Sequence, residues 1–129
     1  MIDASVVVAA IVDSGETSRW AEHILAKGEL VAPHLMLAEA TNALRRAELA
    51  SEISPDTAAL AVRDLVDLPV AFYPFEPFAT RVWNLRQTIT AYDAWYVAVA
   101  ESLDAPLATL DAKLSRAPGT TCRFEVPGF

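Results

Sequence analysis

The chain has 129 residues, of which 53% are apolar, and its 10 basic and 17 acidic side chains give a formal net charge of −7. The length fits a single domain spanning residues 1–129, and the apolar content excludes a disordered acidic tail. The acidic balance argues against a protein that binds nucleic acid through its net charge, because such domains are usually basic.

No segment of the sequence fits a membrane span or a secretion signal. The longest uncharged runs, residues 4–12 and 30–38, have nine residues each, whereas a transmembrane helix needs about 20. Asp3 precedes the first run, where a signal peptide would carry basic residues. Cys122 is the only cysteine, which excludes an intramolecular disulfide and a thiolate metal cluster, and we expect it to be buried and unreactive. We therefore expect a cytoplasmic protein with no membrane partner.

Short apolar runs alternate with longer helical patterns along the chain. In the first half of the chain we expect a strand end at residues 1–3, a helix over 5–12, an amphipathic helix over 17–27, a strand over 30–32 and helices over 34–50 and 54–66. In the second half we expect a strand over 70–73, helices over 76–86 and 90–103, a strand over 107–110, a helical turn over 112–116 and a strand over 123–126. The helix over 90–103 is apolar on almost every side, which is typical of a helix buried in the middle of a domain. This alternation indicates an α/β fold with a parallel sheet that helices cover on both faces.

Two acidic residues follow predicted strands. Asp3 ends the first strand, and Asp111 follows the apolar run 106–110. Because open parallel sheets place ligand sites beyond the carboxyl ends of their strands, these two carboxylates point to one crevice. The local alternatives are that Asp111 caps the helical turn after it and that Asp3 is a turn residue.

Two further acids lie on predicted helices. Glu39 borders an apolar helix face, and Asp93 opens the most apolar helix, where the positive end of the helix dipole favours an acid. The alternatives are an ion pair between Glu39 and Arg45 or Arg46, and a local capping role for Asp93 with Thr90.

Taken together, the four acids are harder to explain locally, because converging carboxylates repel one another and some would stay protonated. A hard divalent cation removes this conflict, since Mg²⁺ and Mn²⁺ take oxygen ligands. The hydroxyls of Ser5 and Thr109, each two positions from an acid, could bind a metal water or a phosphate oxygen, with local capping as the alternative. Asn42, one turn beyond Glu39, could hydrogen-bond that carboxylate or be an ordinary surface amide. The predicted Mg²⁺ or Mn²⁺ site consists of Asp3, Glu39, Asp93 and Asp111.

The segments around the four acids resemble the motifs of a known family. Residues 1–5, Met-Ile-Asp-Ala-Ser before an aliphatic helix, look like the start of a PIN domain, in particular a VapC-type toxin ribonuclease. The second and third acidic motifs of that family are similar to Leu-Ala-Glu-Ala-Thr-Asn-Ala-Leu at 37–44 and Thr-Ala-Tyr-Asp-Ala-Trp-Tyr-Val-Ala at 90–98. The fourth is similar to Leu-Ala-Thr-Leu-Asp-Ala-Lys-Leu at 107–114, with Gly119 after it. The four motifs stand in family order and cover essentially the whole chain.

The resemblance implies a PIN-like α/β/α sandwich with a short-stranded parallel central sheet. It also implies a metal-dependent endoribonuclease that acts as the toxin of a toxin–antitoxin pair. One or two Mg²⁺ or Mn²⁺ ions would activate water for attack on an RNA phosphodiester. A homodimer and a small antitoxin, whose C-terminal segment occupies a groove beside the site, are implied as well. The residues that the resemblance assigns to catalysis and metal binding are Asp3, Glu39, Asp93 and Asp111, with Thr109 assisting.

Two basic pairs follow the acidic motifs and are candidates for contacts with RNA phosphates. They are Arg45 with Arg46, and Lys113 with Arg116. The alternative for each is an ordinary solvated or ion-paired side chain.

Aromatic residues could stack unpaired bases, as they do in many RNA-binding sites. Tyr92, Trp95 and Tyr96 flank Asp93, but on so apolar a helix we expect them to lie mostly in the core. A second aromatic set is expected to pack in the core or to receive a partner helix, and comprises Trp20, Phe72, Phe75, Phe78 and Trp83.

Two other functional classes are open at this point. A receiver-like signalling module would also have an acidic Mg²⁺ pocket, but it usually carries paired acids after its first strand, whereas Asp3 is followed by Ala4 and Ser5. The second class keeps the fold without the activity, as a binding protein for RNA or a protein partner. If metal ions are bound, their local charge rather than the overall field would attract phosphate, so we expect no tight nucleic-acid binding without metal.

Overall fold

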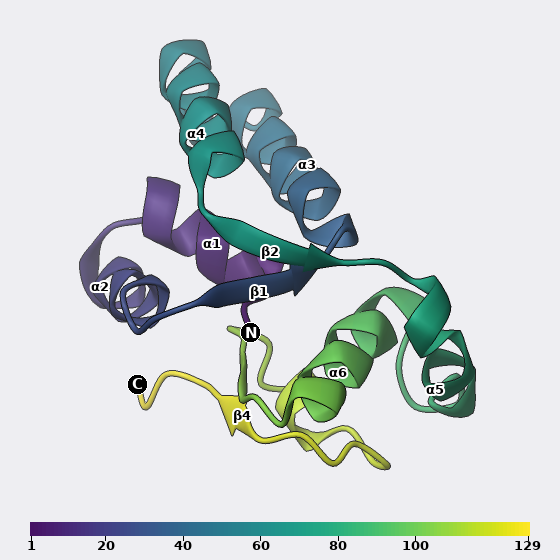
Figure 1. Ribbon diagram of the computed structural model, residues 1–129. Coiled ribbons are helices and arrows are strands. Elements are labelled where there is room, and N and C mark those ends of the chain that lie inside the picture. The colour runs from purple at the N-terminus through teal and green to yellow at the C-terminus, as the bar shows by residue number, and fades with distance from the viewer.

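The computed structural model describes residues 1–129 and contains the expected alternation of helices and strands (Figure 1). The helices are α1 (Ala4–Val12), α2 (Gly15–Leu25), α3 (Leu35–Leu49), α4 (Pro55–Asp67), α5 (Ala79–Asn84) and α6 (Ala91–Leu103), with short 3-10 helices η1 (Glu76–Phe78) and η2 (Leu114–Arg116). The strands are β1 (Leu30–Pro33), β2 (Val70–Tyr73), β3 (Leu107–Ala108) and β4 (Phe124–Glu125). No helix is both long and apolar enough to cross a membrane.

The strands form two parallel pairs rather than the single ladder expected from the sequence. β1 pairs with β2, and β3 pairs with β4. Residues 1–3 run between the pairs, where Ile2 forms a parallel bridge to Ala108 and its N–H donates to Val31 O at 3.1 Å. Strands of two to four residues are too short to extend a continuous ladder, so backbone contacts of the N-terminal residues join the two pairs.

Local side-chain chemistry sets where several helices begin. The Asp3 carboxylate accepts a hydrogen bond from Val6 N and caps α1, and Ser54 caps α4 with Pro55 in its first turn. Thr90 caps α6 by accepting a hydrogen bond from Asp93 N at 3.1 Å. These side chains satisfy amide groups that have no partner within the helix.

Several expected elements are shorter or broken in the structure, among them the helical turn over 112–116 and the strand over 123–126, which are reduced to η2 and β4. The helix expected over 76–86 is divided into η1 and α5, with Pro77 in the first turn of η1. The strand expected over 107–110 ends at Ala108, because Leu110 N donates to the Ser5 hydroxyl at 3.1 Å instead of continuing the ladder.

Helix α6 occupies the centre of the hydrophobic core. Six of its residues are buried, and all of these except Val99 belong to the same core cluster as buried side chains of α1, β1 and α3. Figure 1 shows α3 and α4 side by side on one side of the β1–β2 pair, with α5 and α6 on the other. Burying a Val or Leu side chain contributes about 1.5–3 kcal/mol, so this core holds the N-terminal end of α6 in place beside α1 and β3.

Candidate functional site

Asp3 lies between the bridge at Ile2 and the start of α1, and only 9% of it is exposed. One carboxylate oxygen accepts hydrogen bonds from the Ser5 hydroxyl at 2.6 Å and from Val6 N at 3.2 Å. The other accepts a hydrogen bond from the Thr109 hydroxyl at 2.5 Å. Burial raises the pKa of Asp3, and these hydrogen bonds oppose the rise without cancelling it.

Thr109 connects Asp3 to Asp111. Its side chain is fully buried, and its oxygen both donates to Asp3 and accepts from Asp111 N at 3.0 Å. The start of α1 is therefore tied to the segment that follows β3. The two acids that follow strands lie at one edge of the sheet, as the parallel topology predicts.

Asp111 has the local capping role that the sequence left open, whereas at the start of α6 the cap is the Thr90 side chain and Asp93 contributes only its backbone N–H. Asp111 Oδ1 accepts hydrogen bonds from Lys113 N at 2.9 Å and Leu114 N at 3.2 Å, which begin η2. Asp93 N donates to the Thr90 hydroxyl at 3.1 Å. Burial raises the pKa of Asp93, and the charges of Asp111 and Asp3 raise it further. The capping roles therefore coexist with close approach of these acids.

Glu39 is held by Tyr96, not by an arginine. The Tyr96 hydroxyl of α6 donates to Glu39 Oε1 of α3 at 2.7 Å. The alternative of an ion pair with Arg45 or Arg46 is wrong, because neither arginine forms an ion pair in the structure. Asn42 makes no hydrogen bond to Glu39. Burial raises the pKa of Glu39, as do the charges of Asp93 and Asp3, and the Tyr96 hydrogen bond lowers it.

The hydrogen bond from Tyr96 to Glu39 was not predicted from the sequence. Tyr96 was expected in the core, and it is indeed buried, with 2% of the residue exposed. A buried tyrosine hydroxyl nevertheless needs a hydrogen-bond partner, and Tyr96 is one turn after Asp93 on the same helix. That combination was the signal that could have assigned it to the acidic cluster.

The four acids fit a divalent cation by their chemistry. The two ion pairs of the structure, Lys27 with Glu125 and Arg81 with Glu101, leave all four acids without a basic partner. No group of three or more His, Cys, Asp or Glu side chains is arranged to hold an ion directly. Mg²⁺, however, keeps several waters and uses only one or two protein carboxylates, so oxygen donors in this looser arrangement suit it. The acids concerned are Asp3, Glu39, Asp93 and Asp111.

Two open pockets flank the acids. One has a volume of about 470 Å³ and contains Asp93 and Asp111 together with the basic residues Lys113 and Arg116. The other has a volume of about 260 Å³ and is lined by Leu35, Ala38, Glu39, Asn42 and Tyr92. Of the two basic pairs expected near the acids, Lys113 with Arg116 therefore lies in the pocket of Asp93 and Asp111.

Arg45 lies in a different place. It lines a hollow between α3 and α4 with Glu48 and Pro55, and none of the four acids is part of that hollow. The expectation that Arg45 stands near the acids is therefore wrong. Arg45 comes six positions after Glu39 on α3, about one and two-thirds turns, so it lies on a different face of the helix, toward the groove against α4.

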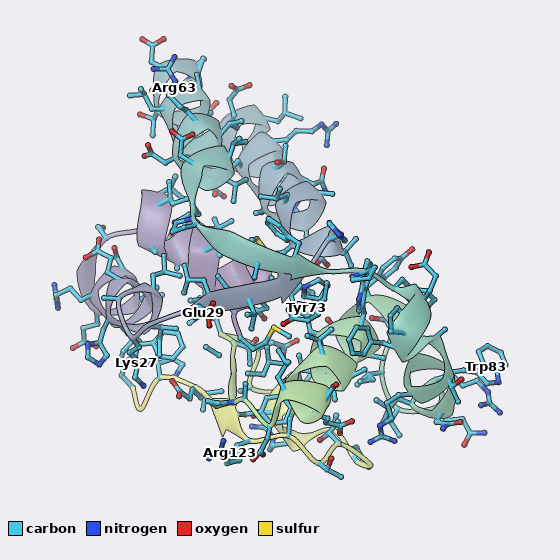
Figure 2. All side chains as sticks on the ribbon, in the orientation of Figure 1. Lys27, Glu29, Arg63, Tyr73, Trp83 and Arg123 are labelled. Atoms are coloured by element: carbon cyan, nitrogen blue, oxygen red, sulfur yellow. The ribbon has the colours of Figure 1, made fainter.

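Tyr92 departs from the expectation that the aromatic residues beside Asp93 lie mostly in the core. It is 62% exposed and lines the pocket that contains Glu39. In the second aromatic set, Trp20, Phe72 and Phe78 pack against the core, whereas Trp83 is 65% exposed and projects from the outer side of α5 (Figure 2). Tyr92 is therefore the aromatic ring available to a ligand at the acids.

Cys122 is partly buried, and burial raises the pKa of its thiol to about 11. The thiol is therefore protonated at neutral pH, which agrees with the unreactive role expected from the sequence.

Comparisons with known proteins agree with this geometry. A family model described as PIN domain matches residues 1–119. Ribonuclease VapC1 of Mycobacterium tuberculosis is 40% identical over 127 residues, which cover 98% of this chain and 96% of the relative.

Two solved structures share the fold. VapC20 of Mycobacterium tuberculosis, described as a Sarcin-Ricin loop cleaving toxin, has a TM-score of 0.69 at 16% identity and covers 93% of this chain and 95% of its own. VapBC2 from Rickettsia felis, bound to a promoter DNA fragment, has a TM-score of 0.69 at 16% identity, and the match covers 98% of this chain and 96% of its own. At this level of identity the two structures establish an α/β fold of the same kind.

Proposed function

The chain belongs to the PIN-domain family and within it to the VapC ribonucleases, and on this premise we propose that it is a metal-dependent endoribonuclease, the toxin of a toxin–antitoxin pair. The observation that supports the proposal is the electrostatic coupling of acids from separate segments: the charge of Asp3 acts on Glu39 and Asp93, and that of Asp111 acts on Asp93, while no basic residue pairs with any of the four. Beside them, Lys113 and Arg116 line the same pocket as Asp93 and Asp111. Carboxylates for metal next to cations for phosphate are the groups that phosphodiester hydrolysis needs.

The proposed metal ligands are Asp3, Glu39, Asp93 and Asp111. A bound Mg²⁺ or Mn²⁺ would supply positive charge to the phosphodiester and lower the pKa of the attacking water. The hydroxyls of Ser5 and Thr109 orient the Asp3 carboxylate, and the Tyr96 hydroxyl orients that of Glu39. Lys113 and Arg116 bind the phosphates that flank the scissile bond.

A cleavage assay tests this function. Purified protein is expected to cut RNA in the presence of Mg²⁺ or Mn²⁺, to lose this activity in EDTA, and to lose it in Asp93→Asn. Asp104→Asn is the matched control, because Asp104 ends the same helix, is exposed, and lies outside the pocket. Cleavage that persists in EDTA, or in Asp93→Asn, contradicts the proposal.

Calorimetry separates an active nuclease from a binding protein with the same fold. We expect the wild type to bind Mn²⁺ and Asp93→Asn to bind it more weakly. If the wild type takes up no Mn²⁺ and cuts no RNA, the chain is an inactive relative that binds RNA or a protein partner.

We propose a cognate antitoxin and a second copy of the chain as the protein partners, with residues 1–129 acting as one domain. The similarity to VapBC2 from Rickettsia felis supports the antitoxin, and the nearly full-length match to Ribonuclease VapC1 supports one domain. The net charge of −7 favours a partner with a basic segment. Light scattering of the purified chain, with and without the protein encoded beside it, tests both interactions.

A further inference from the structure

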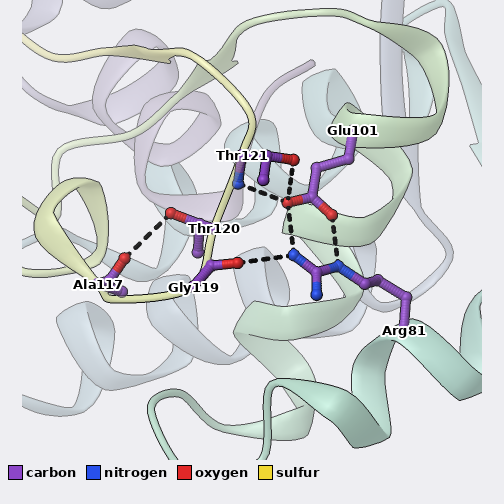
Figure 3. A network of polar contacts seen from close by, with 6 residues as sticks. All are labelled: Arg81, Glu101, Ala117, Gly119, Thr120 and Thr121. Carbon is purple, nitrogen blue, oxygen red and sulfur yellow. Dashed lines mark hydrogen bonds and ion pairs between the residues drawn. The ribbon is translucent and has the colours of Figure 1, made fainter.

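Arg81 of α5 and Glu101 of α6 form a two-pronged ion pair outside the acidic site. Arg81 Nε donates to Glu101 Oε1 at 2.7 Å, and Arg81 Nη2 donates to Glu101 Oε2 at 3.0 Å (Figure 3). The Glu101 side chain is only 12% exposed. This geometry is the parallel pairing that a guanidinium makes with a carboxylate, and it is stronger than an ordinary surface ion pair.

The same pair holds a third segment of the chain. Arg81 Nη2 also donates to Gly119 O at 2.7 Å. Glu101 Oε2 accepts hydrogen bonds from Thr121 N at 2.7 Å and from the Thr121 hydroxyl at 2.9 Å. Figure 3 shows the loop running alongside the head groups of both side chains. Burial alone would raise the pKa of Glu101, but the hydrogen bonds from Arg81 and Thr121 outweigh it and lower the pKa, so the carboxylate is charged at neutral pH.

The residues held in this way, Gly119 and Thr121, directly follow the segment that forms one wall of the pocket at Asp93 and Asp111. That wall runs from Asp111 to Pro118 and carries Lys113 and Arg116, both exposed. The opposite wall, residues 88–90, follows α5, the helix that carries Arg81. We call the ion pair of Arg81 and Glu101 the clamp. Arg81 lies on the helix before one wall and binds Gly119 directly after the other, so the clamp connects the two walls.

The wall has an anchor at its beginning, another in its middle and the clamp at its end. Asp111 caps η2 at the beginning, and the buried Leu114 fixes the middle. Gly119, with φ +86°, adopts a left-handed conformation that other residues rarely take, and its carbonyl meets Arg81 there. Apart from the clamp, the side-chain hydrogen bonds in this stretch run within the segment itself, from the Ser115 hydroxyl to Ala112 O and from the Thr120 hydroxyl to Ala117 O.

We propose that Arg81 and Glu101 are positioning residues for RNA binding, which fix the wall so that Lys113 and Arg116 stand ready beside the acids. This inference rests on the proposed ribonuclease function. Holding two flexible cations in place before the RNA arrives reduces the ordering cost of binding, so loss of the clamp weakens RNA affinity.

A double-mutant cycle distinguishes positioning from simple stabilisation. The dissociation constant for a fluorescent single-stranded oligoribonucleotide is measured with Mg²⁺ in the Asp93→Asn background, where no cleavage occurs. Arg81→Ala is expected to raise this Kd roughly threefold or more, and to have almost no effect once Lys113→Ala and Arg116→Ala are also present. Hydrogen exchange of residues 115–121 is expected to be faster in Arg81→Ala.

Two further variants keep the test interpretable. Lys27→Ala breaks the other ion pair, to Glu125, away from the pocket, and is expected to leave the Kd unchanged. Arg81→Lys keeps a charge beside Glu101 but lacks the fork that also reaches Gly119, so an intermediate Kd is expected. If Arg81→Ala fails to fold, Thr121→Val removes only the hydroxyl contact and is used in the same cycle.

The outcomes separate this inference from the proposed function. Equal effects of Arg81→Ala with and without Lys113 and Arg116, or no effect on Kd, overturn the positioning role even if RNA is cut normally. A wild type that binds RNA but cuts none contradicts the ribonuclease function, while the cycle still decides on positioning. No RNA binding by any variant overturns both.

Discussion

The Tyr96 hydroxyl donates a hydrogen bond to Glu39 Oε1 at 2.7 Å and joins the central helix α6 to α3 across 57 positions of the chain. Glu39 lies within α3, and the contact joins its carboxylate to the helix whose first turn contains Asp93. The core therefore contributes a polar group directly to the acidic cluster.

Replacing Tyr96 by phenylalanine removes this donor while keeping the ring in the core. Because the hydrogen bond lowers the pKa of Glu39, its loss allows burial and the neighbouring charges to raise that pKa further. We expect the acidic limb of the pH–activity profile of Tyr96→Phe to move to higher pH. Tyr73→Phe is the matched control, because the Tyr73 hydroxyl makes no hydrogen bond, and an unchanged profile in Tyr96→Phe would contradict the role.

Asp93 is expected to destabilise the metal-free protein at neutral pH. Its pKa is raised by burial and by the charges of Asp111 and Asp3, so the folded state binds more protons than the unfolded state as pH rises above the ordinary carboxyl range. Stability from this group is thus full at low pH and falls as pH rises through the folded pKa. In EDTA, Asp93→Asn should melt at a higher temperature than the wild type at pH 7, and at nearly the same temperature near pH 4. Asp104→Asn should show no such pH-dependent gain; a gain equal to that of Asp93→Asn would refute the prediction.

Thr109 is expected to matter for both stability and the acidic site. Thr109→Val leaves Asp3 Oδ2 and Asp111 N without their partner in a buried place, which costs about 1–3 kcal/mol of unfolding free energy. Thr109→Ser retains the hydroxyl and should lose much less of the hydrogen-bonding contribution. Urea unfolding of the three proteins measures the difference, and equal losses in the two variants would assign the effect to the methyl group instead.

Tyr92 is expected to stack on an unpaired base of the RNA. The ring is 62% exposed and lines the pocket that contains Glu39, so its removal should leave the melting temperature nearly unchanged. Stacking contributes about 1–3 kcal/mol per base, and we expect Tyr92→Ala to weaken RNA binding by about fivefold or more. Tyr92→Phe keeps the ring and should bind like the wild type, whereas equal affinity of Tyr92→Ala would exclude stacking.

Much of the local structure was predictable, because it depends on residues close together in the chain. Ser54 with Pro55 and Thr90 with Asp93 indicate helix starts that the structure contains. The break at Pro77 and the early end of β3 were not predicted, since the latter depends on a hydroxyl of Ser5 more than a hundred positions away.

By itself, the sequence determined the order of helices and strands, the placement of Asp3 and Asp111 after strands, and the four motifs that identify the family. These features follow from periodicity, capping and residue order, which act over one or two turns. Only the tertiary structure decided that Tyr96 rather than an arginine holds Glu39, that Tyr92 is exposed, and that Arg81 and Glu101 hold the loop at Gly119. The physical reason is that such contacts depend on how elements far apart in the chain pack against each other, and several side chains of suitable chemistry compete for each partner until that packing is known.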